Sequence, residues 1–327
     1  MNKIKVVVTG AAGQIGYSLL FRLASGEVFG NDTQVELSLM DLPQAMKGVE
    51  GVAMELEDSG FPTLTRINCY DNADTAFRGV HWALLVGSTP RGPGMERSDL
   101  IRANGPIFVG QGKALNQADS ALRVVVVGNP CNTNALIAQA NCREIPPHRF
   151  SAMTALDELR AKAQVAKKAG VNVGAITNLV VWGNHSTTMY PNFEDAKING
   201  ALASSVISER RWFTESLLPA VQNRGAEVIA ARGKSSAGSA ASACISHIKN
   251  FLGKTPQGEW FSAAVPSDGH HYGVPKGLMY SFPLVSGGDG TYKIVEGLEL
   301  SAYSRERITI SAEELLKERE VVKDLLL

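Results

Sequence analysis

The stretch that decides the fold of the first half is Ile4–Gly16, IKVVVTGAAGQIG. Residues 4–9 are mostly apolar and β-branched, and such a run favours a strand buried on both faces. Glycines follow at positions 10, 13 and 16, and apolar residues at helical spacing then continue to Leu23. A glycine turn between a strand and a helix lets the backbone approach a pyrophosphate, which then lies at the positive end of the helix. The stretch therefore predicts a dinucleotide-binding turn.

Asp41 is the second part of the predicted cofactor site. It ends the next apolar run, Val35–Met40, where a carboxylate accepts hydrogen bonds from the adenosine ribose and repels the 2′-phosphate of NADP. Two observations weaken the pattern: the glycine spacing is G-x-x-G-x-x-G rather than G-x-G-x-x-G, and Asp is a frequent cap of turns and helices. The order of strand, turn, helix, strand and acid nevertheless predicts NAD as the cofactor.

Apolar runs and helical patterns alternate through the first half. Continuously apolar runs separated by helices indicate a parallel sheet covered on both faces, the doubly wound α/β arrangement of the Rossmann type. We therefore expect an NAD-binding domain over residues 1–150. Further strands are expected at His81–Val86 and Arg123–Val127, and helices at Gln14–Ser25, within Gly48–Asp58 and at Asp99–Asn116.

The pattern changes near Pro146, and residues 151–327 are expected to form a second, mixed α+β domain that binds the substrate. Strand-like pieces with turn residues run from Trp260 to Val295. The sequence SAEE at 311–314 has the spacing of a capping box, which predicts that a terminal helix begins at Ser311. Helices are also expected at Leu156–Ala169, Arg211–Ala231 and Gly238–Leu252.

Composition excludes several classes of protein. Among 327 residues, Lys plus Arg and Asp plus Glu number 32 each, so no net field attracts nucleic acid or an anionic membrane surface. The four cysteines form no C-x-x-C pair and no zinc-like spacing, which favours free thiols in a reducing compartment. No apolar run approaches the ~18 residues of a membrane span, and the first strand does not resemble a signal peptide. We expect a soluble, cytoplasmic protein that uses no metal ion.

A loop rich in glycine, proline and arginine follows the apolar run at 81–86. Residues 87–97, GSTPRGPGMER, contain Arg91 and Arg97. Loops at the carboxyl ends of parallel strands are where ligands bind, and glycines and prolines around two arginines indicate hinges that let a loop close on an anion. The alternative is an exposed basic loop without a function, and the position directly after a strand favours anion binding.

Two further segments carry groups suited to proton chemistry. Asp157 and Arg160 are three residues apart on one face of an expected helix, where a surface ion pair is the more common explanation. His185 ends the run VVWGNH at 180–185, and a histidine in such a place is often a core residue. A buried aspartate beside it would instead hold one tautomer and stabilise the protonated ring. His185 could then exchange a proton with a substrate hydroxyl.

Five motifs, in the same order, resemble those of the malate dehydrogenases in the lactate/malate dehydrogenase family, in the branch related to the animal cytosolic enzymes. They are TGAAGQIG at 9–16, the loop at 90–97, GNP at 128–130, LDELR at 156–160 and WGNH at 182–185. The resemblance extends over the whole chain, through GKSSA at 233–237 to the terminal helix. It implies a homodimer that oxidises malate reversibly to oxaloacetate with NAD, a reaction of the tricarboxylic acid cycle.

The resemblance also implies a role for each motif residue. His185 resembles the proton acceptor in malate oxidation, with Asp157 as its orienting partner. Arg160 resembles the arginine that holds the carboxylate next to the reacting carbon in a bidentate fork. Arg91 resembles the one that grips the distal carboxylate, and Arg97 the one that polarises the carbonyl when the loop closes. Asn129 resembles a contact to both nicotinamide ribose and substrate, and the other implied cofactor contacts are Gly10, Ala11, Ala12, Gly13, Gln14, Ile15, Gly16, Asp41, Asn104, Gln111, Val127 and Gly128.

Arg91 decides the predicted substrate class. Pyruvate has a methyl group where oxaloacetate has its second carboxylate, and a buried arginine without that partner would be a costly unpaired charge. A site built for a polar group rejects analogues that lack it, so we expect a preference for dicarboxylates of about 10³-fold or more.

Three other interpretations compete with this one. Short-chain dehydrogenases and sugar epimerases use a helical Tyr-x-x-x-Lys pair; Tyr272 and Lys276 have that spacing, but the glycine and proline between them disfavour a helix. A non-catalytic NAD-binding sensor or scaffold would keep the glycine turn but have no reason to keep the acid, arginine and histidine. A metal site at His270 and His271 would need a third, spaced ligand, which the sequence does not provide.

Overall fold

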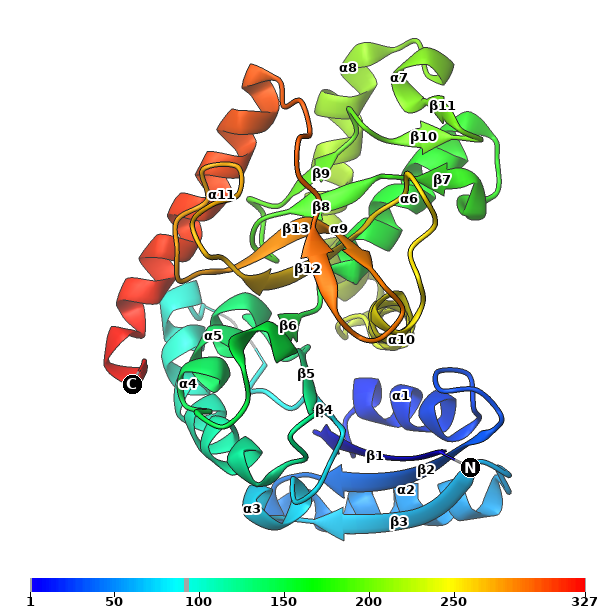
Figure 1. Cartoon of the computed structure of the whole chain (residues 1–327), viewed down its shortest axis with the longest axis vertical. Coiled ribbons are helices and arrows are strands. Elements are labelled where there is room, and N and C mark those ends of the chain that lie inside the picture. The colour runs from blue at the N-terminus through cyan, green and yellow to red at the C-terminus, as the bar shows by residue number, and fades with distance from the viewer. Residues whose placement is uncertain (1, 91–93, 327) are drawn as a thin grey trace. The chain divides into compact units, whose positions relative to one another are not determined.

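The computed structural model describes residues 2–90 and 94–326, which divide into two compact units (Figure 1). The first unit comprises Met1–Ala152 together with two later segments, Ala237–Ile245 and Lys317–Leu327. The second unit comprises Met153–Ser236 and Ser246–Leu316. Helices α10 (Gly238–Leu252) and α11 (Ala302–Val321) each contribute residues to both units.

The first unit contains a parallel sheet in the strand order β3-β2-β1-β4-β5-β6. This order reverses direction between β1 and β4, and in such sheets ligands bind at the carboxyl ends of the strands at that point. The predicted doubly wound sheet is therefore confirmed. In chain order the strands are β1 (Asn2–Thr9), β2 (Thr33–Met40), β3 (Leu64–Tyr70), β4 (Trp82–Leu85), β5 (Arg123–Val126) and β6 (Phe150–Ala152).

Helices connect these parallel strands, as crossover connections require. The central strands are apolar on both faces: the side chains of Val6, Val7, Leu84 and Val125 are almost completely buried. Figure 1 shows α1 and α2 packed beside β1, β2 and β3. The helices are α1 (Gln14–Ala24), α2 (Met46–Asp58), α3 (Ala73–Ala76), α4 (Arg97–Ala114) and α5 (Cys131–Ala140).

The second unit is a mixed α+β structure, as predicted. Its strands pair antiparallel in three groups: β12 and β14 flank β13, β8 pairs with β9, and β10 lies between β7 and β11. The strands are β7 (Ile176–Thr177), β8 (Val180–Trp182), β9 (Tyr190–Asn192), β10 (Lys197–Ile198), β11 (Ala201–Leu202), β12 (Phe261–Pro266), β13 (Met279–Ser286) and β14 (Tyr292–Ile294). The remaining helices are α6 (Ala155–Ala169), α7 (Ala203–Val206), α8 (Arg210–Trp212), the π-helix Phe213–Leu217 and α9 (Leu218–Arg232).

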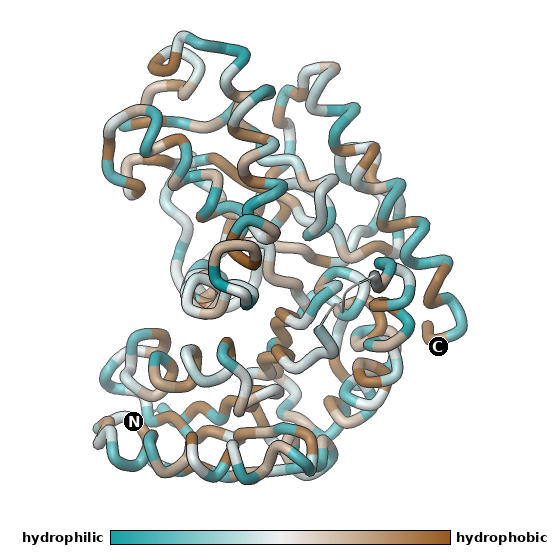
Figure 2. Tube along the Cα trace, turned by 180° about the vertical axis from the view of Figure 1, so that it is seen from behind, coloured by the Kyte–Doolittle hydropathy of each residue, from teal (hydrophilic) through white to brown (hydrophobic). Residues whose placement is uncertain are grey.

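Strand β3 and the start of α11 differ from the predictions. The sequence of β3, LTRINCY, is largely polar and was not predicted as a strand, because an edge strand needs no continuous apolar run. The prediction that the terminal helix begins at Ser311 is wrong, since α11 begins at Ala302. Its buried positions Ser304, Ile308 and Ser311 recur at intervals of three or four, but the serines hide this stripe in the hydropathy pattern. Accordingly, teal and brown alternate along α11 in Figure 2.

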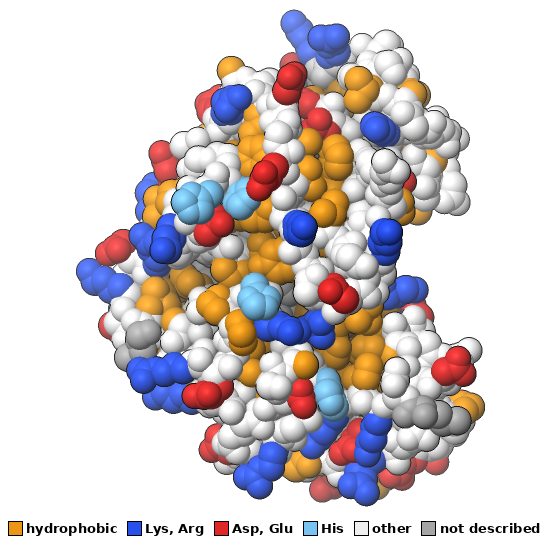
Figure 3. Space-filling model, viewed as in Figure 1, with side chains coloured by type: hydrophobic (Ala, Val, Ile, Leu, Met, Phe, Trp, Pro, Cys, Tyr) orange, Lys and Arg blue, Asp and Glu red, His pale blue; other side chains and the backbone are white. Residues whose placement is uncertain are grey.

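The surface of the described residues carries both signs of charge. On the face in Figure 3, Lys and Arg side chains are interspersed with Asp and Glu, so neither sign dominates that face. All four cysteines are free thiols, and three of them, Cys131, Cys142 and Cys244, are buried. Among the described residues, no helix is both long enough and apolar enough to cross a membrane.

Candidate active site

The glycine turn between β1 and α1 lies against the loop that follows β4. Gly10 has φ +67°, and a Cβ atom at this position would lie 2.7 Å from the Cα atom of Gly87. A Cβ atom on Gly16 would lie 2.4 Å from the carbonyl oxygen of Gly10. No side chain fits at either position, so the two backbone segments approach each other at the point where the strand order reverses.

Asp41 is held directly beside this turn. Its Oδ2 atom accepts a hydrogen bond from the backbone N–H of Ala12 at 3.0 Å, and its Oδ1 atom accepts one from Leu42 at 2.9 Å. Helix α1 has Gly13 as its N-cap and no acidic residue in its first turn, so no carboxylate there opposes a bound anion. A bare backbone turn at a helix N-terminus with a fixed carboxylate beside it fits the pyrophosphate and adenosine ribose of NAD.

Two other predicted cofactor contacts, Asn104 and Gln111, lie inside α4. The Asn104 side chain is buried. Its oxygen accepts from the backbone N–H of Thr89 at 2.7 Å, and its amide donates to the carbonyl oxygen of Thr89 at 3.1 Å, so Asn104 fixes the start of the loop at 87–97. The Gln111 side chain is 5% exposed, and within the described residues its Oε1 atom has no hydrogen-bond partner. A buried acceptor left without a partner is one a ligand could satisfy.

The loop after β5 contains the remaining predicted cofactor contacts. Val127 and Gly128 are buried, and the carbonyl oxygen of Gly128 accepts a hydrogen bond from the Asn134 amide at 2.9 Å. Asn129 is exposed and precedes a cis peptide bond to Pro130. The Asn129 side chain is therefore accessible, while Asn134 holds the backbone of the residue before it.

Of the two loop arginines, Arg91 lies outside the described residues, whereas Arg97 is the first residue of α4. The Nε atom of Arg97 donates to an oxygen of Glu318 at 2.6 Å, and the Thr133 hydroxyl donates to the other oxygen. The Glu318 side chain is buried, whereas that of Arg97 is 32% exposed, so the ion pair between them is partly buried. This ion pair fixes the position of the guanidinium group.

His185, Asp157 and Arg160 form one hydrogen-bonded group in the second unit. Asp157 is completely buried; one of its oxygens contacts Nδ1 of His185, and the other accepts from Nη1 of Arg160 at 3.2 Å. The Arg160 side chain is 13% exposed and donates through Nη2 to Ser236 at 3.1 Å. The pair of Asp157 and Arg160 is therefore not a surface ion pair, because the buried carboxylate ties the arginine to the histidine.

Three residues that support this group were not among the predicted site residues. Ser236 bonds to Arg160, while Ser311 and Glu314 of α11 bond to the residues that flank His185. The capping-box spacing predicted that Ser311 and Glu314 begin a helix, but both lie inside α11 and bond instead to the turn that carries His185. Their partners lie more than 100 residues away in the chain, which no local pattern can indicate.

The competing sites find little support in the structure. Tyr272 lies in a turn with φ +53°, so it and Lys276 do not share a helix face. Within the described ranges, no group of three or more His, Cys, Asp and Glu side chains is arranged to hold a metal ion. His271 instead lies next to two carboxylates, at 3.1 Å from Asp268 and 3.4 Å from Glu296.

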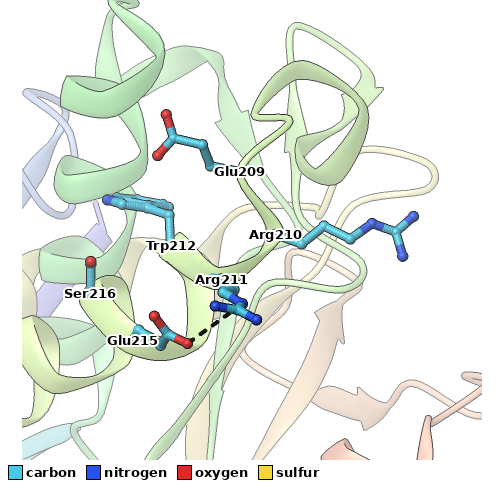
Figure 4. Close-up of a pocket in the computed structure, with 6 residues that line it drawn as sticks. All are labelled: Glu209, Arg210, Arg211, Trp212, Glu215 and Ser216. Atoms are coloured by element: carbon cyan, nitrogen blue, oxygen red, sulfur yellow. Dashed lines mark ion pairs between the residues drawn. The ribbon is translucent and has the colours of Figure 1, made fainter.

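A hollow at the turn into α8 is separate from these groups. Figure 4 shows the side chains that line it, with Glu209 above the Trp212 ring and Arg210 pointing away. Most of these residues are exposed, and Arg211 and Glu215 are 4.0 Å apart on the surface. An exposed ion pair at that distance contributes little to stability, and none of the predicted site residues lines the hollow.

A parallel sheet of this strand order, with a glycine turn where the order reverses, is the arrangement of a dinucleotide-binding domain. Together with a histidine bonded to a buried aspartate in the second unit, it indicates a nicotinamide-dependent dehydrogenase. Family models agree: residues 4–151 match the NAD binding domain of lactate/malate dehydrogenase, and residues 154–326 match its alpha/beta C-terminal domain. The chain belongs to the lactate/malate dehydrogenase family, as the motifs predicted, and NAD is its cofactor.

Individual relatives are similar over the full length. A malate dehydrogenase from Magnetococcus marinus is 55% identical over 325 residues, which cover 99% of each chain. The crystal structure of malate dehydrogenase from Naegleria fowleri has a TM-score of 0.96 and 46% identity, covering 100% of this chain and 99% of that one. A Trichomonas vaginalis lactate dehydrogenase in complex with NADH and oxamate has a TM-score of 0.94 and 35% identity, covering 99% of both chains.

Proposed function

We propose that this protein is a malate dehydrogenase, which interconverts malate and oxaloacetate by NAD-dependent hydride transfer. The observation that carries the proposal is the buried Asp157 carboxylate, which bonds to both His185 and Arg160. A proton acceptor and a carboxylate-binding guanidinium are thereby fixed to one anchor, and an enzyme that acts on a 2-hydroxy acid needs both. The 55% identity to the Magnetococcus marinus malate dehydrogenase supports malate as the hydroxy acid.

His185 is the proposed proton acceptor. Its Nδ1 atom lies against Asp157, so the ring presents Nε2 to the hydroxyl proton of malate. Bound NAD would supply the hydride acceptor for the carbon that carries this hydroxyl, while His185 takes the proton from the oxygen. The resulting imidazolium remains beside the Asp157 carboxylate, whose charge stabilises it. In the reverse direction, protonated His185 returns the proton to the oxygen of oxaloacetate.

Three arginines are proposed to bind the dicarboxylate. Arg160 is bonded to Asp157 and Ser236 through different nitrogens, which fixes the plane of its guanidinium for a bidentate contact with the inner carboxylate. Arg97, held by Glu318, is proposed to polarise the carbonyl. Arg91 is proposed to bind the distal carboxylate and so to select dicarboxylates.

The test is to follow oxidation of NADH while oxaloacetate and pyruvate are offered separately. We expect kcat/KM for oxaloacetate to exceed that for pyruvate by about 10³-fold or more, and Arg91→Gln to lose most of this preference. Arg102→Gln is the matched control, because Arg102 is an exposed arginine on α4 and should keep the wild-type ratio.

The other outcomes are equally informative. If the wild type prefers pyruvate, the enzyme is still a 2-hydroxy-acid dehydrogenase, but Arg91 does not select dicarboxylates. If neither acid is reduced although NADH binds, a non-catalytic NAD-binding sensor or scaffold becomes the better interpretation.

We also propose that the enzyme works as a cytoplasmic homodimer. Its four free cysteines are those of a protein in a reducing compartment. Large apolar side chains exposed on the first unit, Tyr17, Leu42 and Met54, are available to an interface between copies. Sedimentation velocity on the wild type and on Met54→Glu tests the dimer: the variant should dissociate at concentrations where the wild type does not.

A further inference from the structure

The backbone that carries His185 lies against helix α11. The N–H of Asn184 donates to the Ser311 hydroxyl at 2.8 Å. The preceding residue, Gly183, has φ +93°, and a Cβ atom there would lie 2.1 Å from the Ser311 Oγ atom. The turn thus reaches this distance only because position 183 has no side chain. Ser311 therefore fixes the chain immediately before the histidine.

One turn further along α11, a single oxygen of Glu314 binds three side chains of the same turn. Its Oε2 atom accepts from the Asn184 amide at 2.8 Å, from the Thr188 hydroxyl at 2.7 Å and from the Ser186 hydroxyl. Asn184 precedes His185 and Ser186 follows it, so the carboxylate binds both neighbours of the histidine.

The hydroxyls around Glu314 lead to its carboxylate by two routes, one through Thr188 and one through Ser186. Ser311, whose oxygen already accepts from Asn184, lies 2.9 Å from the Thr188 hydroxyl and can donate to it. The Ser186 oxygen accepts from the backbone N–H of Thr188 at 3.0 Å. Each hydroxyl therefore has a proton to give toward Glu314, and hydrogen bonds to a carboxylate are about twice as strong as those to a neutral acceptor.

The imidazole and the backbone of His185 are thus fixed by different elements. Asp157 of α6 fixes the ring through Nδ1, whereas Ser311 and Glu314 of α11 fix the turn from which the ring extends. A proton acceptor must lie within hydrogen-bond reach of its proton, and a misplacement of about 1 Å can cost 10²-fold in rate.

We propose that Glu314, together with Ser311, is a positioning residue for His185: it holds the 184–188 turn so that the ring keeps its contact with Asp157 and its placement for proton transfer. The proposal rests on the proposed role of His185 as proton acceptor.

The first test uses the free protein, so that it does not depend on the substrate. A proton on Nδ1 of His185 that is bonded to Asp157 should give a far-downfield imidazole resonance in ¹H–¹⁵N spectra. The loss of this resonance in His185→Gln would assign it to His185. We expect Glu314→Ala to shift or abolish this resonance and Glu314→Gln, which keeps one acceptor oxygen, to have a smaller effect. Glu313→Gln is the matched control, because Glu313 is the exposed neighbour on the same helix.

The second test separates positioning from loss of folded protein. In Glu314→Ala, kcat per NADH-binding site should fall by about 10- to 10²-fold, while the NADH Kd and the KM for oxaloacetate change by less than about twofold, because the arginines that bind substrate remain. Ser311→Ala should show a smaller effect of the same kind.

An unchanged imidazole resonance in Glu314→Ala overturns the inference, whatever happens to turnover. A normal kcat per binding site, or an equal loss in Glu313→Gln, also overturns it. If the wild type itself fails to reduce oxaloacetate, the proposed function fails, but the resonance comparison still decides whether Glu314 positions His185.

Discussion

The glycine turn of the first unit and the turn at residues 184–188 that carries His185, here called the histidine turn, depend on side chains to different degrees. The glycine turn works because side chains are absent: Gly10 and Gly16 allow backbone to approach backbone, and a Cβ atom on either would lie within 3 Å of other atoms. The histidine turn also needs a glycine, at position 183, but side chains hold it in place: Asp157, Ser311 and Glu314 bind it from two separate helices.

The difference determines how each turn should respond to mutation. A turn defined by missing side chains is damaged by adding a single methyl group, which affects cofactor binding and folding together. A turn held by separate hydrogen bonds loses its function in steps, one contact at a time, while folding and cofactor binding persist. Four substitutions test this contrast, from the largest expected effect to the smallest.

The largest effect is expected from His185→Ala. The variant loses the proton acceptor, so kcat should fall by about 10³-fold or more. The glycine turn is untouched, and the NADH Kd should therefore stay within about twofold of the wild type. Stopped-flow reduction of NAD and NADH fluorescence titration measure the two quantities. Parallel losses in both would mean that His185 is structural and that the two turns do not work separately.

Asp157→Asn tests the anchor of the histidine turn without removing the histidine. The amide keeps the shape of the side chain but loses the charge that binds Arg160 and stabilises protonated His185. We expect kcat to fall by about 10²-fold or more, and KM for oxaloacetate to rise as well because Arg160 loses its partner. A rise in KM with a normal kcat would show that Asp157 positions Arg160 but does not assist His185.

Gly10→Ala tests the glycine turn, with Gly170→Ala as a matched control. Both glycines have nearly the same φ, +67° and +68°, but a Cβ atom at Gly170 would meet nothing within 4 Å. The control should lose about 1 kcal/mol of unfolding free energy for its left-handed backbone alone. Gly10→Ala should lose about 1–3 kcal/mol more by overpacking, and its NADH Kd should rise. If urea denaturation shows the same loss of unfolding free energy in Gly10→Ala and Gly170→Ala, the close approach of Gly10 to Gly87 does not contribute to the destabilisation.

The smallest effect is expected from Asp41→Ser. Serine removes the charge that would repel the 2′-phosphate of NADP, so the ratio of kcat/KM for NADH to that for NADPH should fall by about tenfold. Since Asp41 also accepts from Ala12, affinity for NADH should fall slightly. If the ratio of kcat/KM for NADH to that for NADPH is unchanged, Asp41 does not bind the ribose and only supports the glycine turn.

The sequence by itself determined the parts of the protein whose signal is local. The apolar run at 4–9, the glycines after it and Asp41 lie within one strand-turn-helix-strand segment, because a parallel sheet with a bare turn imposes its pattern on adjacent residues. His185, Asp157 and Arg160 were also predicted as site residues, through motif spacing and resemblance rather than through contacts. The capping-box pattern at Ser311 showed the limit of local reasoning.

Only the tertiary structure decided what surrounds these residues. In the folded protein Asp157 is completely buried, and its carboxylate binds both Arg160 and His185. Asn104, inside α4, fixes the start of the loop at 87–97. The tertiary structure also brought Ser311 and Glu314 to a turn more than 100 residues earlier in the chain. A buried polar group must find a partner wherever the fold supplies one, and that partner's place in the sequence is set by packing rather than by any local period.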